Sequence, residues 1–415
     1  MKSEKLIQDV AIIGLGYVGE PLMRACLNAG IKTFGIDLNP TRLEQLNALS
    51  ADGRNQPVLG SDWGVIAGVD VIVICVPTPV DEHRKPDYSH VISSTLEVGR
   101  NLSPTKHQLV ILESTVAPGT TGGRVKDALE SQSGLTAGRD FSIAFSPERI
   151  DPKNNSYALE NTPKVVGGLT ETCTNFATLF YENFVSDVVR ASGLEEAEAS
   201  KILENTYRHI NIALINEFAD ICQGLDIDVR EVVRLAATKP FGFQKFLPSI
   251  GAGGHCIPVD PNYLQDLAMT ELGYGSLMIR SASEINDKRP KQVAQRVIDA
   301  LKTLKTTGSS KAKILILGLS YKPDVGDFRE SKQVELVIEL SNLGFKPRMH
   351  DPFMLSQPDF GIWVGADELG TEIDSADLVV IAQAHSEYLQ GPWIARAASK
   401  LFNATGETIP SAWRI

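Results

Sequence analysis

The feature that most constrains this 415-residue chain is a glycine-rich turn that separates an apolar run from a helix-like segment near its start. The turn lies within Val10-Ala-Ile-Ile-Gly-Leu-Gly-Tyr-Val-Gly-Glu-Pro-Leu22, and a second strand-like run, Ile31-Lys-Thr-Phe-Gly-Ile-Asp37, ends in an acid. The order strand, tight turn, helix, strand and acid is that of a βαβ unit in a parallel sheet. It predicts an α/β fold that begins with a Rossmann-like domain.

Each glycine of this turn has its own physical reason. Gly14 permits the sharp turn, and Gly16 lets the backbone approach a pyrophosphate at the helix N-terminus. Gly19 lets the helix pack closely on the strand, and Asp37 can accept hydrogen bonds from ribose hydroxyls. Because a carboxylate repels a 2′-phosphate, the pattern favours NAD over NADP; the alternative is a Rossmann-like unit without a ligand.

Further strand-like runs end in polar residues. Val69–Pro79 and Leu109–Val116 are rich in β-branched residues, as expected of buried parallel strands. Ligands of such sheets bind beyond the carboxyl ends of the strands, so we expect Thr78, Ser114 and Thr115 to surround the cofactor. The alternative for each is a strand cap. The run Phe141–Arg149 ends another strand at Glu148, and Thr162–Gly168 forms a further one.

A long helical pattern runs from about Glu195 to Cys222 without an interior Gly or Pro, which predicts a helix that connects two domains. Lys201 and Asn205 lie four residues apart and share one face of it. A second strand–glycine–helix unit begins at Ile314, after a polar loop, with Gly318 as its single glycine. We expect a related α/β domain there that binds something other than a full dinucleotide, with Lys322 and Arg329 suited to phosphate.

The stretch Gly251-Ala-Gly-Gly-His-Cys-Ile-Pro-Val-Asp-Pro261 presents a thiol between glycines and prolines. Glycines allow a ligand to come close, and the carboxylate of Asp260, four residues after Cys256, can manage protons or water. From the residues alone, a nucleophilic cysteine and a structural turn with a bystander thiol both remain open.

Composition excludes several classes of protein. A formal charge of −11 argues against binding nucleic acid or an anionic membrane through bulk electrostatics. No stretch approaches ~18 uninterrupted apolar residues, and the N-terminal residues lack the pattern of a signal peptide. The 5 cysteines are odd in number and scattered, which fits a reducing compartment, and no zinc-ligand spacing is present. We therefore expect a cytoplasmic protein without a metal.

The quoted segments resemble the UDP-glucose/GDP-mannose dehydrogenase family over nearly the whole chain. The resemblance is carried by Gly14–Gly19, Cys75–Pro79, Glu113–Thr115, Ser146–Arg149, Lys201–Asn205, Gly253–Asp260 and Gly318–Ser331. It implies two Rossmann-like parallel-sheet domains joined by a long central helix and a helical dimerisation region. The implied boundaries are 1–194 for the NAD domain, 195–305 for the central region and 306–415 for a UDP-sugar domain, in a homodimer.

The resemblance also implies a four-electron oxidation of the sugar C6 alcohol to a carboxylate with two NAD+ and a thiohemiacetal and thioester on Cys256. The segments His255–Pro261, Ala236–Phe243 and Ser146–Pro152 are most similar to the UDP-N-acetylglucosamine branch. UDP-N-acetylmannosamine and UDP-glucose stay open as substrates, and a non-catalytic NAD-binding regulator is the alternative from another class.

The residue roles that the resemblance implies fall into three groups. The catalytic group is Cys256, Lys201, Asn205, Asp260, Glu148 and Thr115. The cofactor-binding group is Gly14, Gly16, Tyr17, Val18, Gly19, Asp37, Arg42, Pro77, Thr78, Ser114, Thr115 and Arg329. The substrate-binding group is Glu148, Arg149, Lys201, Asn205, Gly253, His255 and Lys322. The division of proton transfers among Glu148, Asp260 and Lys201 is left open.

Overall fold

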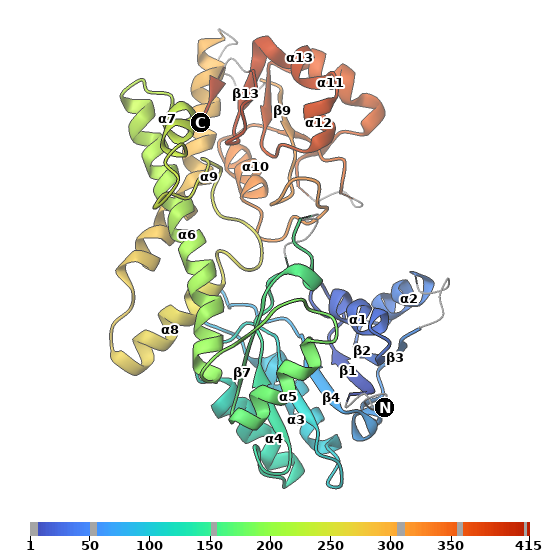
Figure 1. Cartoon of the computed structure of the whole chain (residues 1–415). Helices are drawn as coiled ribbons and strands as arrows, with labels where there is room; N and C mark the ends of the chain where they lie inside the picture. The colour runs from blue at the N-terminus through green and yellow to red at the C-terminus, as the bar shows by residue number, and fades with distance from the viewer. Residues whose placement is uncertain (1–6, 50–55, 151–155, 305–311, 355–359, 411–412) are drawn as a thin grey trace. The chain divides into compact units, whose positions relative to one another are not determined.

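The computed structural model describes residues 7–49, 56–150, 156–304, 312–354, 360–410 and 413–415 (Figure 1). The chain divides into two compact units. The first contains Met1–Glu204 and Asn262–Gly273, and the second contains Asn205–Pro261 and Tyr274–Ile415. The long helix α6 (Leu194–Gly224) begins in the first unit and ends in the second.

The first unit is built on an eight-stranded sheet in the order β3-β2-β1-β4-β5-β6-β7-β8. Its strands are β1 (Asp9–Ile13), β2 (Lys32–Ile36), β3 (Val58–Gly60), β4 (Val71–Ile74), β5 (Leu109–Leu112), β6 (Ser142–Phe145), β7 (Lys164–Gly168) and β8 (Val188–Arg190). Neighbouring strands pair in parallel except β6 and β7, which are antiparallel. The carboxyl end of β6 pairs with Gly167 and Gly168, so the residues that follow β6 run back toward the start of β7.

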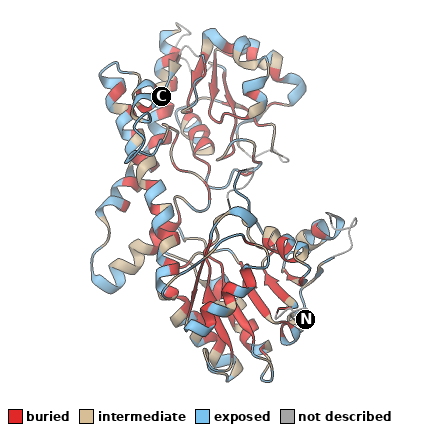
Figure 2. Ribbon diagram, viewed as in Figure 1, coloured by how far each residue is buried: buried red, intermediate tan, exposed pale blue. Residues whose placement is uncertain are grey.

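The apolar runs are buried on both faces of this sheet. Along β4, Val71 and Val73 belong to one core, whereas Ile72 and Ile74 belong to the other, because successive side chains of a strand point to opposite faces. Figure 2 shows the strands as the most buried part of the unit. Its helices are α1 (Gly19–Asn28), α2 (Pro40–Leu49), α3 (Ser89–Asn101), α4 (Lys126–Ser133) and α5 (Glu171–Tyr181), with short turns η1 (Trp63–Gly68), η2 (Thr121–Val125) and η3 (Leu159–Asn161).

The segment between the two sheets is helical. After α6 come α7 (Val229–Ala236), α8 (Asp260–Leu272) and α9 (Leu277–Thr303). The loop that carries Cys256 lies between α7 and α8. The helix expected from about Glu195 to Cys222 is thus present as α6, slightly longer at both ends.

The second unit contains a six-stranded parallel sheet in the order β11-β10-β9-β12-β13-β14. The strands are β9 (Ile314–Leu317), β10 (Arg348–His350), β11 (Ile362–Trp363), β12 (Leu378–Ile381), β13 (Leu401–Asn403) and β14 (Trp413–Arg414). The helices are α10 (Lys332–Asn342), α11 (Leu369–Ser375), α12 (Ser386–Gln390) and α13 (Trp393–Ala397), with turns η4 (Ala366–Glu368) and η5 (Ala398–Lys400). Its order repeats that of the first six strands of the first sheet, which confirms the prediction of two related α/β sheets.

Among the described residues, no helix is long and apolar enough to cross a membrane.

Candidate active site

The glycine-rich turn follows β1 in the first unit, and its geometry matches the role predicted for each glycine. Gly14 has φ +84°, and a Cβ there would lie 2.7 Å from the carbonyl oxygen of Cys75. A Cβ on Gly19 would lie 1.9 Å from the carbonyl oxygen of Gly14, so only glycine allows α1 to start this close to β1. A Cβ on Gly16 would have nothing within 4 Å. The open position is the one predicted to face a pyrophosphate, so the turn fits a dinucleotide.

Asp37 follows β2 and braces this turn. Its carboxylate accepts hydrogen bonds from the backbone N–H of Leu15 at 2.9 Å and of Asn39 at 2.8 Å, and the side chain stays half-buried. Arg42 donates to the carbonyl oxygen of Leu15 at 2.8 Å and pairs with Glu20. Asp37 and Arg42 therefore fix the turn from one side, and Asp37 still has lone pairs open to a ribose.

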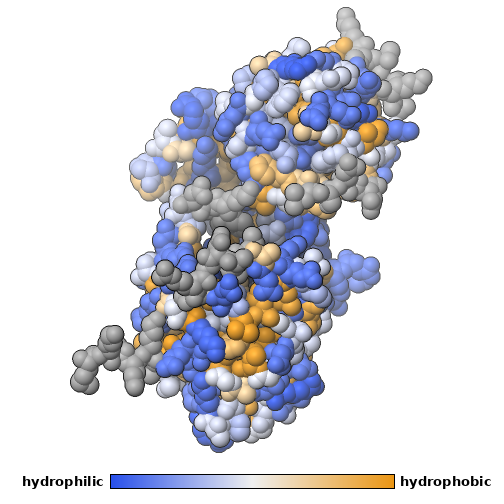
Figure 3. Space-filling view, turned by 90° about the vertical axis from the view of Figure 1, so that its right-hand side faces the viewer, coloured by the Kyte–Doolittle hydropathy of each residue, from blue (hydrophilic) through white to orange (hydrophobic). Residues whose placement is uncertain are grey.

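Two exposed apolar side chains lie near this end of the sheet. Leu38, directly after Asp37, is 78% exposed, and Tyr17 in the glycine turn is 55% exposed. Val18, the residue before α1, is half-buried. Figure 3 shows the side of the first unit that carries α1, α2 and β3, where apolar residues (orange) gather between hydrophilic ones (blue).

The ends of β4 and β5 are fixed by side chains that bond to backbone. The buried Ser114 hydroxyl donates to the carbonyl oxygen of Val76 at 2.7 Å, so it caps the strand, whereas Thr115 is half-buried. Tyr263, from α8, donates to the carbonyl oxygen of Thr78 at 3.0 Å and packs edge-on against Tyr88. Pro77, beside Thr78, is exposed. The role of Tyr263 was not predicted, because its partner lies 185 residues away in the sequence.

Glu148, after β6, contacts Lys201 on α6. The Lys201 ammonium donates to the main-chain oxygen of Glu148 at 2.6 Å and lies 3.3 Å from its carboxylate. The two side chains are only 12% and 7% exposed, so the interaction is shielded from solvent. Glu148 and Lys201, which the sequence analysis assigned to one site, are therefore in direct contact.

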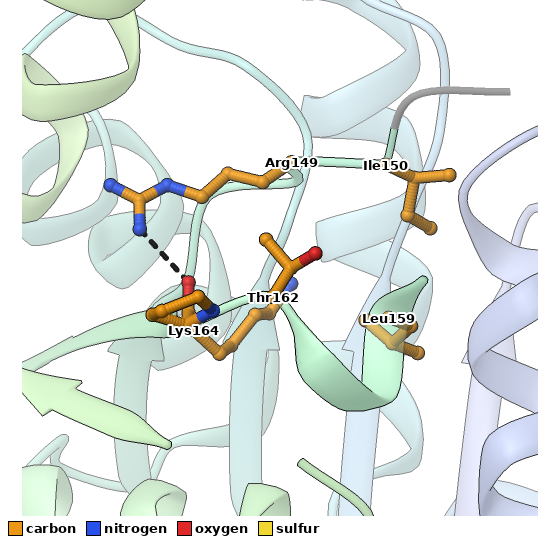
Figure 4. Close-up of a pocket in the computed structure, with 6 residues that line it drawn as sticks. Arg149, Ile150, Leu159, Thr162 and Lys164 are labelled. Atoms are coloured by element: carbon orange, nitrogen blue, oxygen red, sulfur yellow. Dashed lines mark hydrogen bonds between the residues drawn. The ribbon is translucent and has the colours of Figure 1, made fainter. Parts of the chain in front are cut away.

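Arg149, next to Glu148, bonds to other protein groups. It donates to the carbonyl oxygen of Pro163 at 2.9 Å, drawn as a dashed line in Figure 4, and pairs with Glu204 on α6. In Figure 4 Ile150, Leu159, Thr162 and Lys164 line the same shallow pocket. Arg149 was predicted to bind substrate, and in this structure its guanidinium holds protein groups.

In the second unit, Asn205 and Asp260 are joined. The side-chain amide of Asn205 donates to the Asp260 carboxylate at 2.5 Å, and Asp260 is buried. The backbone N–H of Asp260 donates to the carbonyl oxygen of Cys256 at 2.8 Å, so the cysteine stands one turn before α8. Among the five thiols, Cys256 is exposed and the other four are buried. An exposed thiol on a loop, one turn before a helix that begins with a buried carboxylate, is typical of a nucleophile rather than of a core cysteine.

The glycines before Cys256 let the loop lie against the start of the second Rossmann-like segment. A Cβ on Gly254, at φ +88°, would lie 2.9 Å from the ring of Tyr321. A Cβ on Gly253 would lie 3.0 Å from the carbonyl oxygen of Glu330, which also accepts the N–H of Gly254 at 3.3 Å. The thiol loop therefore packs against Tyr321 and Glu330 so closely that a side chain at position 253 or 254 would displace a neighbour.

His255 and Arg329 are electrostatic neighbours in this unit. Burial of part of the ring and the Arg329 guanidinium lower the pKa of His255, which keeps the imidazole neutral near pH 7. Arg329 makes a two-point ion pair with Asp327, at 2.9 and 2.7 Å. These bonds outweigh burial and lower the pKa of Asp327. Lys322 is half-buried. Of the two cations predicted to suit phosphate, Arg329 already has a protein carboxylate beside it.

Three buried residues of the first unit were given no role by the sequence analysis: Glu113, Lys164 and Tyr181. The available signal was a lysine within an otherwise apolar strand, Lys164-Val-Val-Gly-Gly168.

In the described part of the chain, no group of three or more His, Cys, Asp or Glu side chains is arranged to hold a metal ion.

Comparison with known families finds three matches that follow one another along the chain. Residues 61–185 match the NAD binding domain of the UDP-glucose/GDP-mannose dehydrogenase family, and residues 195–288 match its central domain. Residues 315–404 match its UDP binding domain. The matches fall in the order that the motifs predicted.

Individual relatives agree over most of the length. The chain is 35% identical to Protein CapL of Staphylococcus aureus, covering 92% of this chain and 91% of that protein. It is 34% identical to a UDP-N-acetyl-D-glucosamine 6-dehydrogenase of Pseudomonas aeruginosa, covering 91% of each. A solved structure of UDP-D-ManNAc dehydrogenase from Pyrococcus horikoshii superposes with a TM-score of 0.86 at 28% identity, covering 98% of both chains.

Proposed function

The chain belongs to the UDP-glucose/GDP-mannose dehydrogenase family and is an NAD-dependent UDP-sugar dehydrogenase, and we propose that it oxidises UDP-N-acetylglucosamine at C6 to the uronic acid. The observation that carries the proposed chemistry is the exposed Cys256 thiol, one turn before the buried Asp260 carboxylate that Asn205 holds. The coarse assignment, a dehydrogenase of the UDP-N-acetylhexosamine kind, agrees with the named relatives.

The proposed reaction has two oxidations. NAD+, when bound, accepts the hydride that the sugar C6 loses in each of them. Between the two, the sulfur of Cys256 attacks the C6 aldehyde and forms a thiohemiacetal. Loss of hydride from this adduct gives a thioester, and water then breaks the carbon–sulfur bond, releasing the carboxylate and the thiol.

The other residues act on protons and on developing charge. Lys201 and Asn205 lie one turn apart on α6 and supply an ammonium and an amide, donors that stabilise an alkoxide or oxyanion at C6. Asp260, with Thr115, positions the attacking water or takes its proton, and Glu148 is the other candidate base. Lys322 and His255 contact the substrate, and Arg329 reaches the cofactor, as the family motifs imply.

The choice of sugar rests on motifs. The segments Ser146–Pro152, Ala236–Phe243 and His255–Pro261 are similar to the N-acetylglucosamine branch, and the Pseudomonas relative carries that name. UDP-N-acetylmannosamine is the second candidate, because the Pyrococcus structure of that specificity has the same fold over the whole chain.

A panel of UDP-sugars assayed for NADH production tests the proposal. We expect the highest kcat/KM with UDP-N-acetylglucosamine and two NADH per sugar, with Cys256→Ser stalling before the second. A preference for UDP-N-acetylmannosamine would replace the substrate, and one NADH with free aldehyde would overturn the covalent half of the reaction.

We also propose that the protein is cytoplasmic and that its domains comprise residues 1–194, 195–305 and 306–415.

We further propose that the chain forms a homodimer. The support for the dimer is an exposed apolar stripe on α6, formed by Tyr207, Leu214, Phe218 and Ile221 at helical spacing. Exposures of 38 to 59% on four large apolar residues are unusual for a helix that faces water alone. Light scattering should give twice the chain mass, and a monomer with Leu214→Glu; a monomeric wild type would refute the dimer.

A further inference from the structure

The segment that carries Glu148 is joined to β7 by side-chain bonds to backbone. Ser146 donates to the carbonyl oxygen of Val165 at 2.8 Å, and Lys164 donates to that of Pro147 at 3.1 Å. Arg149 donates in turn to the carbonyl oxygen of Pro163 (Figure 4). These bonds continue the antiparallel pairing of β6 and β7 past the end of the ladder. They fix the backbone on both sides of Glu148.

Lys164 makes its bond from a buried position. Its side chain is 3% exposed and lies 3.0 Å from the carboxylate of Glu113, which is 2% exposed. Tyr181 donates to the other carboxylate oxygen, and the lysine ammonium lies 5.1 Å from the centre of the Tyr181 ring. Burial and the neighbouring Glu113 charge raise the pKa of Tyr181 well above its usual range, so the phenol remains a donor. The charge of Lys164 is therefore balanced inside the protein.

Lys164 links the residues that follow two strands, because it contacts both Glu113 and Pro147. Glu113 follows β5 and directly precedes Ser114 and Thr115, whereas Pro147 follows β6 and directly precedes Glu148. The backbone oxygen of Glu148 is itself the acceptor that holds the ammonium of Lys201. A displacement of the backbone at Pro147 would therefore move both the Glu148 carboxylate and the Lys201 ammonium.

We propose that Lys164, balanced by Glu113, is a positioning residue that sets the place of Glu148 and Lys201 for the oxidation at C6. The inference rests on the proposed function, since it assumes that Glu148 and Lys201 act at the reacting carbon. The competing explanation is that Lys164 serves only to neutralise a buried carboxylate, in which case its bond to Pro147 has no effect on the rate.

A paired substitution separates these explanations. Lys164→Met alone leaves Glu113 buried without a counter-charge, so it destabilises the fold for a reason unrelated to catalysis. Glu113→Gln with Lys164→Met removes both charges together but does not restore the bond to Pro147. We expect this double variant to fold, with kcat lowered about 100-fold, the scale of a 1 Å misplacement of a catalytic group. KM for both substrates should change by less than about threefold, because neither binding surface contains the pair.

The chain offers a control at the opposite end of the strands, near the amino ends of β4 and β5. Lys106 donates to the carbonyl oxygen of Gly68 at 2.7 Å and pairs with Asp70 at 2.8 Å, ahead of β5 and β4. Asp70→Asn with Lys106→Met removes a lysine–carboxylate–backbone arrangement of the same kind, although more exposed, far along the strands from their carboxyl ends. We expect kcat within about twofold of wild type for this control.

Combining the double substitution with Glu148→Gln distinguishes a positioning role from a purely structural one, because only a positioning role predicts that the two effects on kcat are not additive. In a Glu148→Gln enzyme, adding the Glu113/Lys164 double substitution should lower kcat by less than about threefold, because the group being positioned is already lost. Ser146→Ala removes another of the bonds to β7 without changing charge. It should lower kcat in the same direction by about threefold or more, and it tests the idea even if the double variant does not fold.

The outcomes are distinguishable. If Glu148→Gln slows turnover while the double variant keeps kcat within about twofold of wild type, Lys164 only neutralises Glu113 and the inference is wrong. An unchanged kcat in Ser146→Ala would also count against it. If Glu148→Gln itself turns over at the wild-type rate, the proposed role of Glu148 fails, and the positioning role fails with it.

Discussion

The two Rossmann-like sheets have the same turn after their first strand, but the turn has different surroundings in each. Gly14, after β1, has φ +84° and donates its N–H to the carbonyl oxygen of Ile36 at 2.9 Å. Gly318, after β9, has φ +86° and donates to the carbonyl oxygen of His350, also at 2.9 Å. In each unit an aspartate after the second strand accepts N–H groups from the turn, at Leu15 in one and at Leu319 in the other.

The two turns differ in how far the aspartate is enclosed by protein groups. Asp37 is half-buried and accepts two backbone N–H groups, whereas Asp351 is 2% exposed and is bonded on all sides. Asp351 accepts from the N–H groups of Leu319, Ser320 and Phe353, and it contacts the His385 ring at 3.0 Å. Where Gly16 leaves open space, the second turn has the fully buried Ser320. The same backbone design leaves space that fits a ligand in the first unit and is closed by protein groups in the second.

The largest expected effect comes from exchanging the two acids for amides. Asp351→Asn should lower the free energy of unfolding by about 3 kcal/mol, because it replaces a buried carboxylate that accepts hydrogen bonds from three backbone N–H groups and contacts the His385 ring. Asp37→Asn should cost less than about 1 kcal/mol of stability, since its surroundings are partly solvated. Its effect should be about a tenfold rise in KM for NAD+, or ~1.4 kcal/mol of binding. Denaturant unfolding and steady-state kinetics measure the two quantities.

Each variant is the control for the other. If Asp351→Asn unfolded at the wild-type denaturant concentration, the bonds around Asp351 would not stabilise the second unit. If instead Asp37→Asn left KM for NAD+ unchanged, the acid would brace the turn without reaching the ribose, and the two units would be alike after all.

The contrast also shows how far sequence reasoning reaches. The turn at Gly14–Gly19 and the acid at position 37 were predictable because the relevant residues lie close together in a pattern with a period and a known spacing. The closed state of Asp351 was not predictable, because it depends on His385, which is 34 residues away and is brought near by strand pairing. The bonds from Tyr263 to Thr78 and from Lys164 to Pro147 were missed for the same reason.

Within the site, sequence spacing placed Lys201 and Asn205 on one helical face but could not supply their partners. Lys201 contacts Glu148 and Asn205 contacts Asp260, each about 50 residues away in the sequence. For Arg149 the structure adds a bond to the backbone at Pro163 that its motif did not predict, and the implied substrate contact stays a prediction. A motif identifies which residues take part, and the tertiary contacts decide how each one is used.

A smaller effect, on acid stability, sharpens the comparison further. Burial tends to raise the pKa of Asp351, but the bond from His385 and the backbone N–H groups outweigh it, and the net pKa is lowered. A carboxyl with a lowered folded-state pKa stabilises the fold above the unfolded pKa of about 3.9, and this contribution is lost as the pH falls through the folded value. The difference in Tm between wild type and Asp351→Asn should therefore be largest above about pH 5 and should narrow below about pH 4.

The buried His350, close to Asp351, acts in a separate pH range. Burial lowers the pKa of His350, so its protonation in the unfolded state costs stability as the pH falls below about 6.5. The Asp351 charge opposes this lowering, so Asp351→Asn should lower the pKa of His350 further, and both proteins should lose stability as the pH falls from 7 to 5. Scanning calorimetry from pH 7 to pH 3 measures both ranges. A Tm difference that stays constant down to pH 3 would mean that the Asp351 charge does not stabilise the second turn, and that its closure depends on packing alone.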